Sequence, residues 1–351
     1  MWSYLARRLL YSIPVYLGII LIMMGALRIR DPVSAYLGKN ATAETAALKK
    51  ASMGLDRPFL PIAVESKDDP FGVEPLAQVG RVGLYAPMKT QYFEFLSRIV
   101  RLDFGSAEKP YRSWQFESED VGAKLADAVW PTLKITIPTL VLTAGIAILV
   151  GLLSAAMRGS AIDRTLMVLV VLGMSISVVV FIVLGQVFGS SWLNGKLGFE
   201  LFASNGYEPG IGNWVRYCAL PVIIGVVVGM GYDARFYRAV MVEETGRDYI
   251  TTAIAKGAPR SKVIFAHMLK NAMIPVITRV MITIPFLITG SIVMEYQFRI
   301  PGMGKLLIDA IINKDFPLIQ TFTAVLAGLF ILTNILTDVL YALVDPRVRL
   351  A

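Results

Sequence analysis

The sequence has little charge and almost none of the side chains that bind metals. Charged residues make up 17% of its 351 residues, and the mean hydropathy is +0.61. A typical soluble domain has about 25% charged residues. There is one cysteine, Cys218, and one histidine, His267. One cysteine excludes a disulfide within the chain, and one histidine excludes a histidine metal cluster. We expect Cys218 to be a small buried apolar residue.

Motifs of nucleotide-hydrolysing and bond-hydrolysing enzymes are also absent. No HExxH or GxSxG sequence occurs. The stretch GMGKLL contains Gly-Lys, but a phosphate-binding loop would need glycine where Arg299 stands and Ser or Thr where Leu306 stands. The sequence therefore predicts that the protein is not an enzyme, and that no cofactor or metal binds to this chain.

Long apolar runs are what the sequence has instead. A transmembrane helix needs about 20 mostly apolar residues. Six runs are close to that length: Leu9–Leu27, Ile135–Met157, Thr165–Leu193, Trp214–Tyr232, Ala272–Met294 and Phe316–Thr337. They predict an all-α polytopic membrane protein with six transmembrane helices. Glycines four residues apart, at 185 and 189 and at 225 and 229, indicate close helix packing.

The basic residues predict that both chain ends are cytoplasmic. Arg7 and Arg8 precede the first run, and further basic residues lie in the loops that six spans place on the same side. The net charge of +8 is therefore mostly a topology signal, and a nucleic-acid partner is disfavoured. The first run could be a signal peptide, but it is long for one and no cleavage site follows it.

The spans divide the chain into three parts. Residues 1–28 are the N-terminal tail and first helix, residues 29–130 are a long extracytoplasmic segment, and residues 131–351 are a core of helices two to six. The middle segment forms either a small folded cap or helices lying on the membrane surface. Apolar residues at helical spacing predict a helix near its end: Tyr92, Phe95, Leu96 and Ile99.

One polar stretch, DYITTAIAKGAPRSKVIFAHMLKNAMIPVI at 248–277, separates the fourth and fifth runs. Acidic residues at the start and a lysine at the end predict a helix over Glu243–Lys256. Gly257 is suited to cap that helix, Pro259 to start another, and Ser261–Asn271 to continue it. The pattern predicts a helix–corner–helix elbow whose apolar edge docks a partner. The simpler alternative is a basic loop that only sets topology.

This stretch resembles the cytoplasmic coupling loop of ABC importer permeases in the dipeptide/oligopeptide/nickel family. The resemblance continues through YLARRLLYSIPVYLG, GLDRP, RLDFGSA, EYQFRIPGMG, KDFPLIQ and DVLYALVDPRVRL, in order along nearly the whole chain. The N-terminal pattern is similar to the first, B-type permease of an oligopeptide or dipeptide transporter. The implied fold is a type I ABC importer permease with a coupling loop at 236–273. Residues near 59–89 look like an insertion.

The resemblance also implies functional residues. Those of the ATPase-coupling loop are Glu244, Asp248, Tyr249, Thr252, Ala253, Ala255, Lys256, Gly257, Ala258, Pro259, Val263, His267 and Asn271. Those of an outer gate loop are Glu295, Phe298, Pro301, Gly302 and Gly304. Polar residues of spans three and five are candidates for the translocation path: Ser175, Ser177, Gln186, Thr283 and Thr289. Two of these residues have an alternative: His267 with no special role, and Glu295 as an exposed loop acid.

A member of that family would be the permease subunit of an ATP-driven importer in the bacterial cytoplasmic membrane. With a second, C-type permease it would enclose a path for peptides that an extracytoplasmic binding protein delivers. Two ABC ATPase subunits would dock on the coupling helix and bind ATP and Mg. The alternatives are import of a nickel chelate, an opine or an oligosaccharide, an ion-driven carrier, and a membrane scaffold. Few ionisable residues lie inside the spans, which disfavours the ion-driven carrier.

Overall fold

The computed structural model describes residues 2–27, 42, 44–46, 48, 62–65, 81–84, 90–101, 120–289 and 292–344. The chain forms two compact units. The first comprises residues 1–8, 127–308 and 329–351, and the second comprises residues 9–126 and 309–328.

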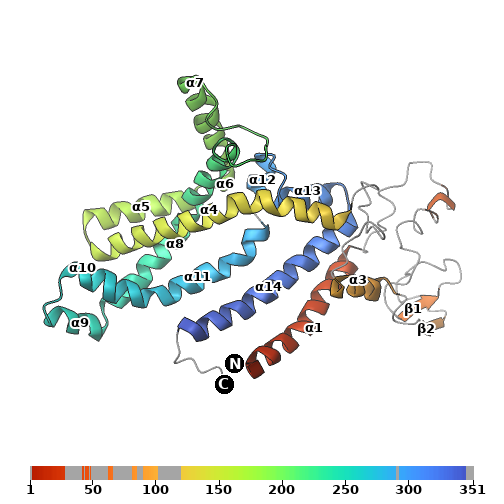
Figure 1. Ribbon diagram of the computed structural model, residues 1–351, viewed down its shortest axis with the longest axis horizontal. Helices are drawn as coiled ribbons and strands as arrows, with labels where there is room; N and C mark the ends of the chain where they lie inside the picture. The colour runs from red at the N-terminus through yellow and green to blue at the C-terminus, as the bar shows by residue number, and fades with distance from the viewer. Residues whose placement is uncertain are drawn as a thin grey trace. The chain divides into compact units, whose positions relative to one another are not determined.

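Nearly all of the described chain is helical (Figure 1). The long helices are α1 (Trp2–Ala26), α4 (Val121–Ala156), α5 (Ala161–Ser175), α8 (Leu220–Thr245), α11 (Leu269–Thr289) and α14 (Phe316–Val344). The shorter ones are α3 (Gln91–Val100), α6 (Val178–Leu184), α7 (Leu193–Leu197), α9 (Asp248–Ala255), α10 (Arg260–Lys262), α12 (Ile292–Gln297) and α13 (Met303–Ile312). Three π-helical segments occur in the described chain: η3 (Gly185–Trp192) joins α6 to α7, η4 (Val215–Ala219) leads into α8, and η5 (Val263–Met268) joins α10 to α11.

Six helical segments are long and apolar enough to cross a membrane, which confirms the number that the sequence predicts. They are Arg7–Ala26, Val121–Ala156, Val178–Leu197, Val215–Thr245, Arg260–Thr283 and Phe316–Thr337. The fold class is therefore the expected all-helical membrane protein. The first, second, fourth and sixth segments cover most of the corresponding predicted runs. The third and fifth segments have bounds that differ from those of the predicted runs.

The third span is not the single helix predicted over Thr165–Leu193. α5 ends at Ser175, and Ile176 has an extended backbone with φ −93° and ψ 131°. The Ser175 hydroxyl donates to the carbonyl four residues earlier at 2.8 Å. Ser177 caps α6 by accepting a hydrogen bond from the amide two residues later. Serine side chains that bond to the backbone compete with helical hydrogen bonds, so this helix breaks without a proline.

Glycines bring the helices of the first unit close together, as their spacing predicts. A Cβ on Gly225 of α8 would lie 2.9 Å from Thr139 Cγ2 on α4. A Cβ on Gly189 of η3 would lie 2.8 Å from Leu220 Cδ1 on α8. Both distances are shorter than ordinary contact, so a Cβ at either position would require the facing side chain, Thr139 or Leu220, to move.

In the second unit, α3 packs against α1 and the first part of α14. The predicted amphipathic helix is confirmed, with Tyr92 and Phe95 buried in a cluster with Ile20 and Ala324. The Tyr92 hydroxyl donates to the carbonyl of Leu17 at 2.9 Å. This bond and the apolar contacts attach the end of the segment 29–130 to the first span.

Two short strands, β1 (Ile62–Glu65) and β2 (Arg81–Leu84), add to the all-helical prediction. They pair antiparallel, with Ile62 opposite Leu84 and Glu65 opposite Arg81. Both lie within the insertion predicted near 59–89. The remainder of that insertion, and most of the segment 29–130, lie outside the described residues.

Candidate functional site

The predicted helix–corner–helix elbow is present, at one end of α8 and α11 (Figure 1). Its first helix, α9, is shorter than the predicted Glu243–Lys256, because the helical backbone is interrupted just before Asp248. α8 continues to Thr245, so Glu243 and Glu244, predicted to start the elbow helix, lie in the last turn of α8, and Asp248 is the acidic residue that starts α9. Gly246 then ends α8, and Arg247, with φ −79° and ψ 146°, starts α9.

Side chains on both sides of this break hold the two helices together. Arg247 Nη2 lies 2.7 Å from Glu243 Oε1, and its Nε lies 3.8 Å from Glu244 Oε1. The Tyr249 hydroxyl donates to the Glu244 carboxylate. Burial raises the pKa of Tyr249, so this phenol stays protonated and remains a donor. The end of α8 and the start of α9 therefore have a defined angle.

The corner itself is built on Gly257, as the sequence predicts. Gly257 has φ +76°, a left-handed conformation that strains residues with a Cβ. Its amide donates to the carbonyl of Ile254 at 2.9 Å, and the amide of Ala258 donates to that of Ala253 at 3.1 Å. These two bonds form a Schellman motif, which satisfies the last carbonyls of α9 and turns the chain sharply.

The second arm of the elbow is continuous with the fifth span. Pro259 precedes α10, and the helix continues from Arg260 through η5 into α11 without a gap. One continuous helical segment thus comprises the predicted second helix, Ser261–Asn271, and most of the predicted fifth span, Ala272–Met294. α11 ends at Thr289, and the predicted end of the span falls in the separate helix α12. A continuous helix transmits a push on the elbow directly into the membrane core.

The elbow packs on the inner core of the first unit. Its buried residues are Ile250, Ala253, Val263 and Met268, which share a cluster with Leu152, Ala155, Val170, Tyr237 and Met241. In addition, Arg260 Nη2 donates to the carbonyl of Ala156, at the end of α4, at 2.5 Å. A loop that served only as a topology signal would not need this packing. The elbow is therefore an ordered part of the core.

The opposite edge of the elbow is exposed. Ile254 on α9 is 60% exposed and Phe265 on η5 is 59% exposed. Three basic residues close to them in the sequence, Lys256, Arg260 and Lys262, are also exposed. We call this edge the elbow surface. Exposed apolar side chains with basic neighbours fit a surface that a partner protein covers.

The predicted coupling residues differ in burial. Ala253 and Val263 are buried, while Glu244, Tyr249, Ala258 and His267 are half-buried. The exposed ones are Asp248, Thr252, Ala255, Lys256, Gly257, Pro259 and Asn271. The imidazole of His267 makes no hydrogen bond with any residue that the structure describes, and its backbone carbonyl accepts from Asn271 Nδ2 at 3.0 Å. Within the described part of the chain, the His267 side chain therefore does not bridge the two arms of the elbow by a hydrogen bond.

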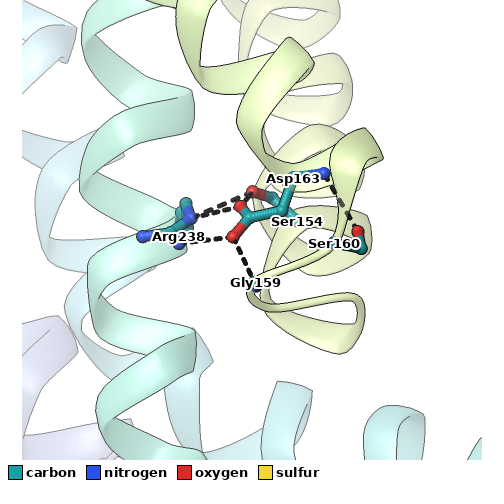
Figure 2. Close-up of polar contacts among 5 residues, drawn as sticks. All are labelled: Ser154, Gly159, Ser160, Asp163 and Arg238. Carbon is teal, nitrogen blue, oxygen red and sulfur yellow. Dashed lines mark hydrogen bonds and ion pairs between the residues drawn. The ribbon is translucent and has the colours of Figure 1, made fainter.

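An ion pair joins three helices close to the elbow (Figure 2). Arg238 on α8 donates from Nε to Asp163 Oδ1 and from Nη2 to Oδ2, each at 2.7 Å. Ser154 on α4 donates to the same carboxylate, and the amide of Gly159 does so at 3.0 Å. Hydrogen bonds from Arg238 are the main cause that lowers the pKa of Asp163. The carboxylate is therefore ionised and holds α4, α5 and α8 together.

Sequence reasoning missed this cluster. Arg238 belongs to a basic stretch that is explained by topology alone, and Asp163 follows a turn as a common helix-start residue. Asp163 does lie in the first turn of a helix, because its amide donates to Oγ of the N-cap residue Ser160 at 3.2 Å. The sequence contains one indication, because Asp163 is the single acidic residue between the second and third apolar runs. Its partner, 75 residues away, has no signature in the sequence.

The predicted outer gate loop folds around a buried carboxylate. Glu295 is 1% exposed, so it is not the exposed loop acid of the alternative interpretation. Its Oε1 accepts from the Thr132 hydroxyl at 2.9 Å, and its Oε2 accepts from the amide of Gly304 at 2.7 Å. The Lys305 amide donates to the same Oε2 at 3.3 Å. The carboxylate thus caps the N-terminus of α13.

Burial raises the pKa of Glu295 to about 7, although the three hydrogen bonds act in the opposite direction. A Cβ at Gly302 would overlap both Glu295 Oε2 and Thr132 Oγ1. A Cβ at Gly304 would lie 2.7 Å from the Cα of Ile292. The two glycines of the PGMG motif are therefore needed for the backbone to approach the carboxylate. Of the other predicted gate residues, Phe298 is buried and Pro301 is exposed.

A cavity of about 290 Å³ lies inside the first unit, between α4, α6, α8, α11 and α12. Its wall is mostly apolar, with hydroxyl groups from Thr136, Thr139 and Thr143 on α4 and Thr283 on α11. Asp233 on α8 also lines it, and its Oδ1 lies 3.1 Å from Nε of Arg279 on α11. Arg279 is therefore half of an ion pair between two spans.

The predicted path residues lie mostly elsewhere. Only Thr283 lines this cavity. Ser175 and Ser177 are exposed and bond to their own backbone at the break between α5 and α6. Gln186 donates to the carbonyl of Ser204 at 3.2 Å, and the side chain of Thr289 lies outside the described part of the chain. The sequence analysis did not single out this cavity wall, because the threonines of α4 and the glycines of α8 resemble packing residues.

A family comparison agrees with this arrangement. The model of the family described as "binding-protein-dependent transport system inner membrane component" matches residues 147–350, which is more than half of the chain. The chain belongs to this family. The matched part contains α5 to α14, and therefore the elbow, the Asp163–Arg238 pair and the Glu295 loop.

Relatives of this permease match it over its full length. A Brucella suis protein named as a peptide permease is 31% identical, over 99% of each chain. A Sinorhizobium fredii protein named as a peptide ABC transporter permease is 29% identical, over 99% of this chain and 100% of the relative. The glutathione transport system permease protein of Salmonella choleraesuis is 29% identical, over 99% of each chain. The permease is thus a multi-pass inner-membrane component of an ABC transport system.

Proposed function

We propose that this permease is the B-type subunit of an ATP-driven importer and that it carries peptides into the cytoplasm. The names of its relatives support a peptide substrate, because two are named for peptides and glutathione is itself a tripeptide. The observation that carries the coupling role is the elbow. It is packed on the core, it continues directly into a membrane span, and it exposes apolar and basic side chains.

The elbow surface is the docking site that we propose for an ATPase subunit. Ile254 and Phe265 would enter a groove of the ATPase, and Lys256 would face acidic groups at its rim. ATP and Mg bind to the two ATPase subunits in this scheme, and this chain holds no cofactor. Closure of the ATPase pair would push α9 and rotate α11 against α8. The Asp163–Arg238 pair would make α4, α5 and α8 move as one body.

The same scheme assigns the other partners and the orientation. A second, C-type permease would complete the translocation path, and an extracytoplasmic binding protein would deliver the peptide. The elbow must face the cytoplasm to meet an ATPase, so both chain ends would also be cytoplasmic. The basic residues near the start of α1, Arg7 and Arg8, support that orientation.

The first experiment is purification of the tagged chain from its native host in mild detergent. We expect a second permease and ATPase subunits in stoichiometric amounts, identified by mass spectrometry. The complex is then reconstituted into liposomes with its binding protein, and uptake of a labelled tripeptide is measured with and without ATP. Recovery of the chain alone, or uptake driven by an ion gradient without ATP, would contradict the proposal.

Two substitutions at the corner test the coupling role. A Cβ on Gly257 would meet nothing within 4 Å, so the cost of Gly257→Ala is the left-handed strain of about 1–2 kcal/mol. We expect Gly257→Ala to assemble and transport nearly normally. Gly257→Asp adds a charge beside the elbow surface, so it should assemble, hydrolyse ATP and transport poorly. Normal uptake by Gly257→Asp would argue against docking at this edge.

A further inference from the structure

Two polar groups on the cavity wall lack a hydrogen-bond partner within the described part of the chain. Thr143 is only 6% exposed, and its buried hydroxyl makes no hydrogen bond there. Asp233 accepts from Nε of Arg279 at Oδ1, at 3.1 Å, and its Oδ2 accepts from no described residue. A carboxylate has about four lone-pair positions, so most of its accepting capacity is unused. Polar groups inside a protein rarely lack partners, which makes this part of the wall a candidate binding site.

The two groups lie one helical turn apart on facing helices. A Cβ on Gly225 of α8 would lie 2.9 Å from Thr139 Cγ2 of α4, and a Cβ on Gly229 would lie 3.1 Å from Thr143 Cγ2. Both helices advance by four residues between these contacts, and the next residue of α8 on this face is Asp233. That step is a rise of about 6 Å. Because glycine has no side chain, positions 225 and 229 leave the space beside the threonines open.

The fifth span adds a third acceptor to the same cavity. Thr283 lies one turn from Arg279 on the same face of α11, and Thr283 lines the cavity whereas Arg279 does not. The Thr283 hydroxyl donates to the carbonyl of Arg279 at 3.0 Å, so its proton is engaged and its oxygen lone pairs remain available. Asp233, Thr143 and Thr283 therefore bring acceptors from two helices and a hydroxyl from a third to one cavity.

The charge and the acceptors of this wall select a cationic donor. Among the described residues that line the cavity, Asp233 has the one charged side chain. The Thr139 hydroxyl donates to the carbonyl of Ile135 at 2.7 Å, so it also presents lone pairs. A primary ammonium group has three N–H donors and one positive charge. It can therefore bind Oδ2 of Asp233 while Oδ1 keeps its pair with Arg279, and charge-assisted hydrogen bonds of this kind are strong.

The size of the cavity indicates an organic ammonium group. A water molecule takes about 30 Å³, so a cavity of about 290 Å³ is far larger than a bare inorganic cation needs. This volume is at the small end of ligand pockets, enough for one end of a peptide. The rest of the wall is mostly apolar and includes Ile135, Leu140, Val178, Val228 and Met294. An α-ammonium group with the first side chain of a peptide fits both the polar and the apolar parts.

We propose that this cavity binds the N-terminal end of the transported peptide, with its α-ammonium group on Asp233, Thr143 and Thr283. Asp233 lies in a helix that is long and apolar enough to span the membrane. Ionisable residues inside spans are rare and usually mark a substrate or ion pathway, which agrees with this assignment. Arg279 stays outside the site and pairs with the other oxygen of the carboxylate. This inference rests on the proposed function, the import of peptides.

Uptake by the reconstituted complex tests the proposal. The substrates are labelled trialanine, its N-acetyl form, which lacks the ammonium group, and its C-terminal amide, which keeps it. We expect Asp233→Asn to reduce uptake of trialanine and of the amide about tenfold, since one charge-assisted hydrogen bond is worth about that factor. Uptake of the N-acetyl form should be nearly unchanged. The binding protein is the same throughout, so a changed ratio of free to N-acetyl peptide is a property of the membrane path.

Arg279→Gln is the matched control, because it breaks the same ion pair and leaves the acid on the cavity wall. It should keep the wild-type ratio of free to N-acetyl peptide, whatever its effect on total uptake. An equal loss of that ratio in both variants would assign the effect to the ion pair and overturn the ammonium site. Absence of ATP-dependent peptide uptake by the wild-type complex would overturn the proposed function. Normal wild-type uptake with an unchanged ratio in Asp233→Asn would overturn only the ammonium site.

Thiol protection gives a second measurement if Asp233→Asn does not assemble or the N-acetyl peptide is not delivered. It uses the solubilised complex without its binding protein. Thr139→Cys places a thiol on the cavity wall, and the native Cys218 is buried. We expect a small thiol reagent to label Thr139→Cys, and trialanine to protect it at about a tenth of the concentration needed with the N-acetyl form. Absence of labelling, equal protection by both peptides, or equal protection by sodium chloride alone would overturn the proposal.

Discussion

Replacing Arg238 by methionine should destabilise this permease more than replacing its partner Asp163 by asparagine. Both substitutions break the same ion pair, but Arg238→Met leaves the Asp163 carboxylate without its partner, and Asp163→Asn leaves the Arg238 guanidinium without its partner. The Asp163 side chain is 5% exposed and that of Arg238 is 27% exposed, so only the guanidinium can recover hydration. An uncompensated buried charge costs about 3–5 kcal/mol, which we expect for Arg238→Met. For Asp163→Asn we expect about 1–3 kcal/mol, from lost charge-assisted hydrogen bonds.

The double variant sharpens this comparison. Arg238→Met with Asp163→Asn removes both charges, so it should be more stable than Arg238→Met alone by about 2 kcal/mol. The assay is the SDS mole fraction at which half of the purified protein unfolds in mixed micelles. Arg235→Met, at an exposed site on α8, is the control and should change stability by less than about 0.5 kcal/mol. The reasoning would be refuted if the two single variants lost equal stability and the loss in the double variant were the sum of the two.

The pH dependence of the same variants is a second test. Arg238 lowers the pKa of Asp163, so this stabilisation is present above the ordinary aspartate pKa of about 4 and is lost as the pH falls through the lowered pKa. Without Arg238, the pKa of Asp163 rises, because burial is then the largest influence on it. Arg238→Met should therefore regain stability relative to wild type as the pH falls from about 7 to about 4. A constant difference over this range would contradict the assignment.

Four further predictions concern the Glu295 loop and the elbow. Since the pKa of Glu295 is raised to about 7, its contribution to stability should fall by about 3 kcal/mol as the pH rises from about 4.5 to 7. Glu295→Gln should remove that slope in the SDS titration. Gly302→Ala should cost about 1–3 kcal/mol in the same titration, because its Cβ displaces the buried carboxylate from its donors. Ile250→Ala should cost about 2–5 kcal/mol. Ile254→Ala should leave stability unchanged and reduce the ATPase recovered on co-purification.

Local features of this permease follow from the sequence alone. The length of each apolar run places six spans, because the hydrocarbon thickness demands about 20 such residues whatever the neighbours. Gly257 followed by Pro259 predicts the corner, because left-handed backbone and a blocked amide are properties of single residues. The amphipathic helix around Phe95 is equally local. The predicted start of the elbow helix, Glu243, lies five residues before the observed start of α9 at Asp248. The acidic residues before Gly246 continue α8, and Gly246 then ends it.

Tertiary structure decided the pairings. Asp163 meets Arg238 across 75 residues, Asp233 meets Arg279 across 46, and Thr132 meets Glu295 across 163. A periodic pattern tells which face of a helix is apolar, but it does not tell which other helix covers that face. The cavity has the same origin, because threonines of α4 and glycines of α8 line it only once those two helices pack together. The sequence determined the spans and the elbow, and packing determined which charges meet, because ion pairs depend on distance in space.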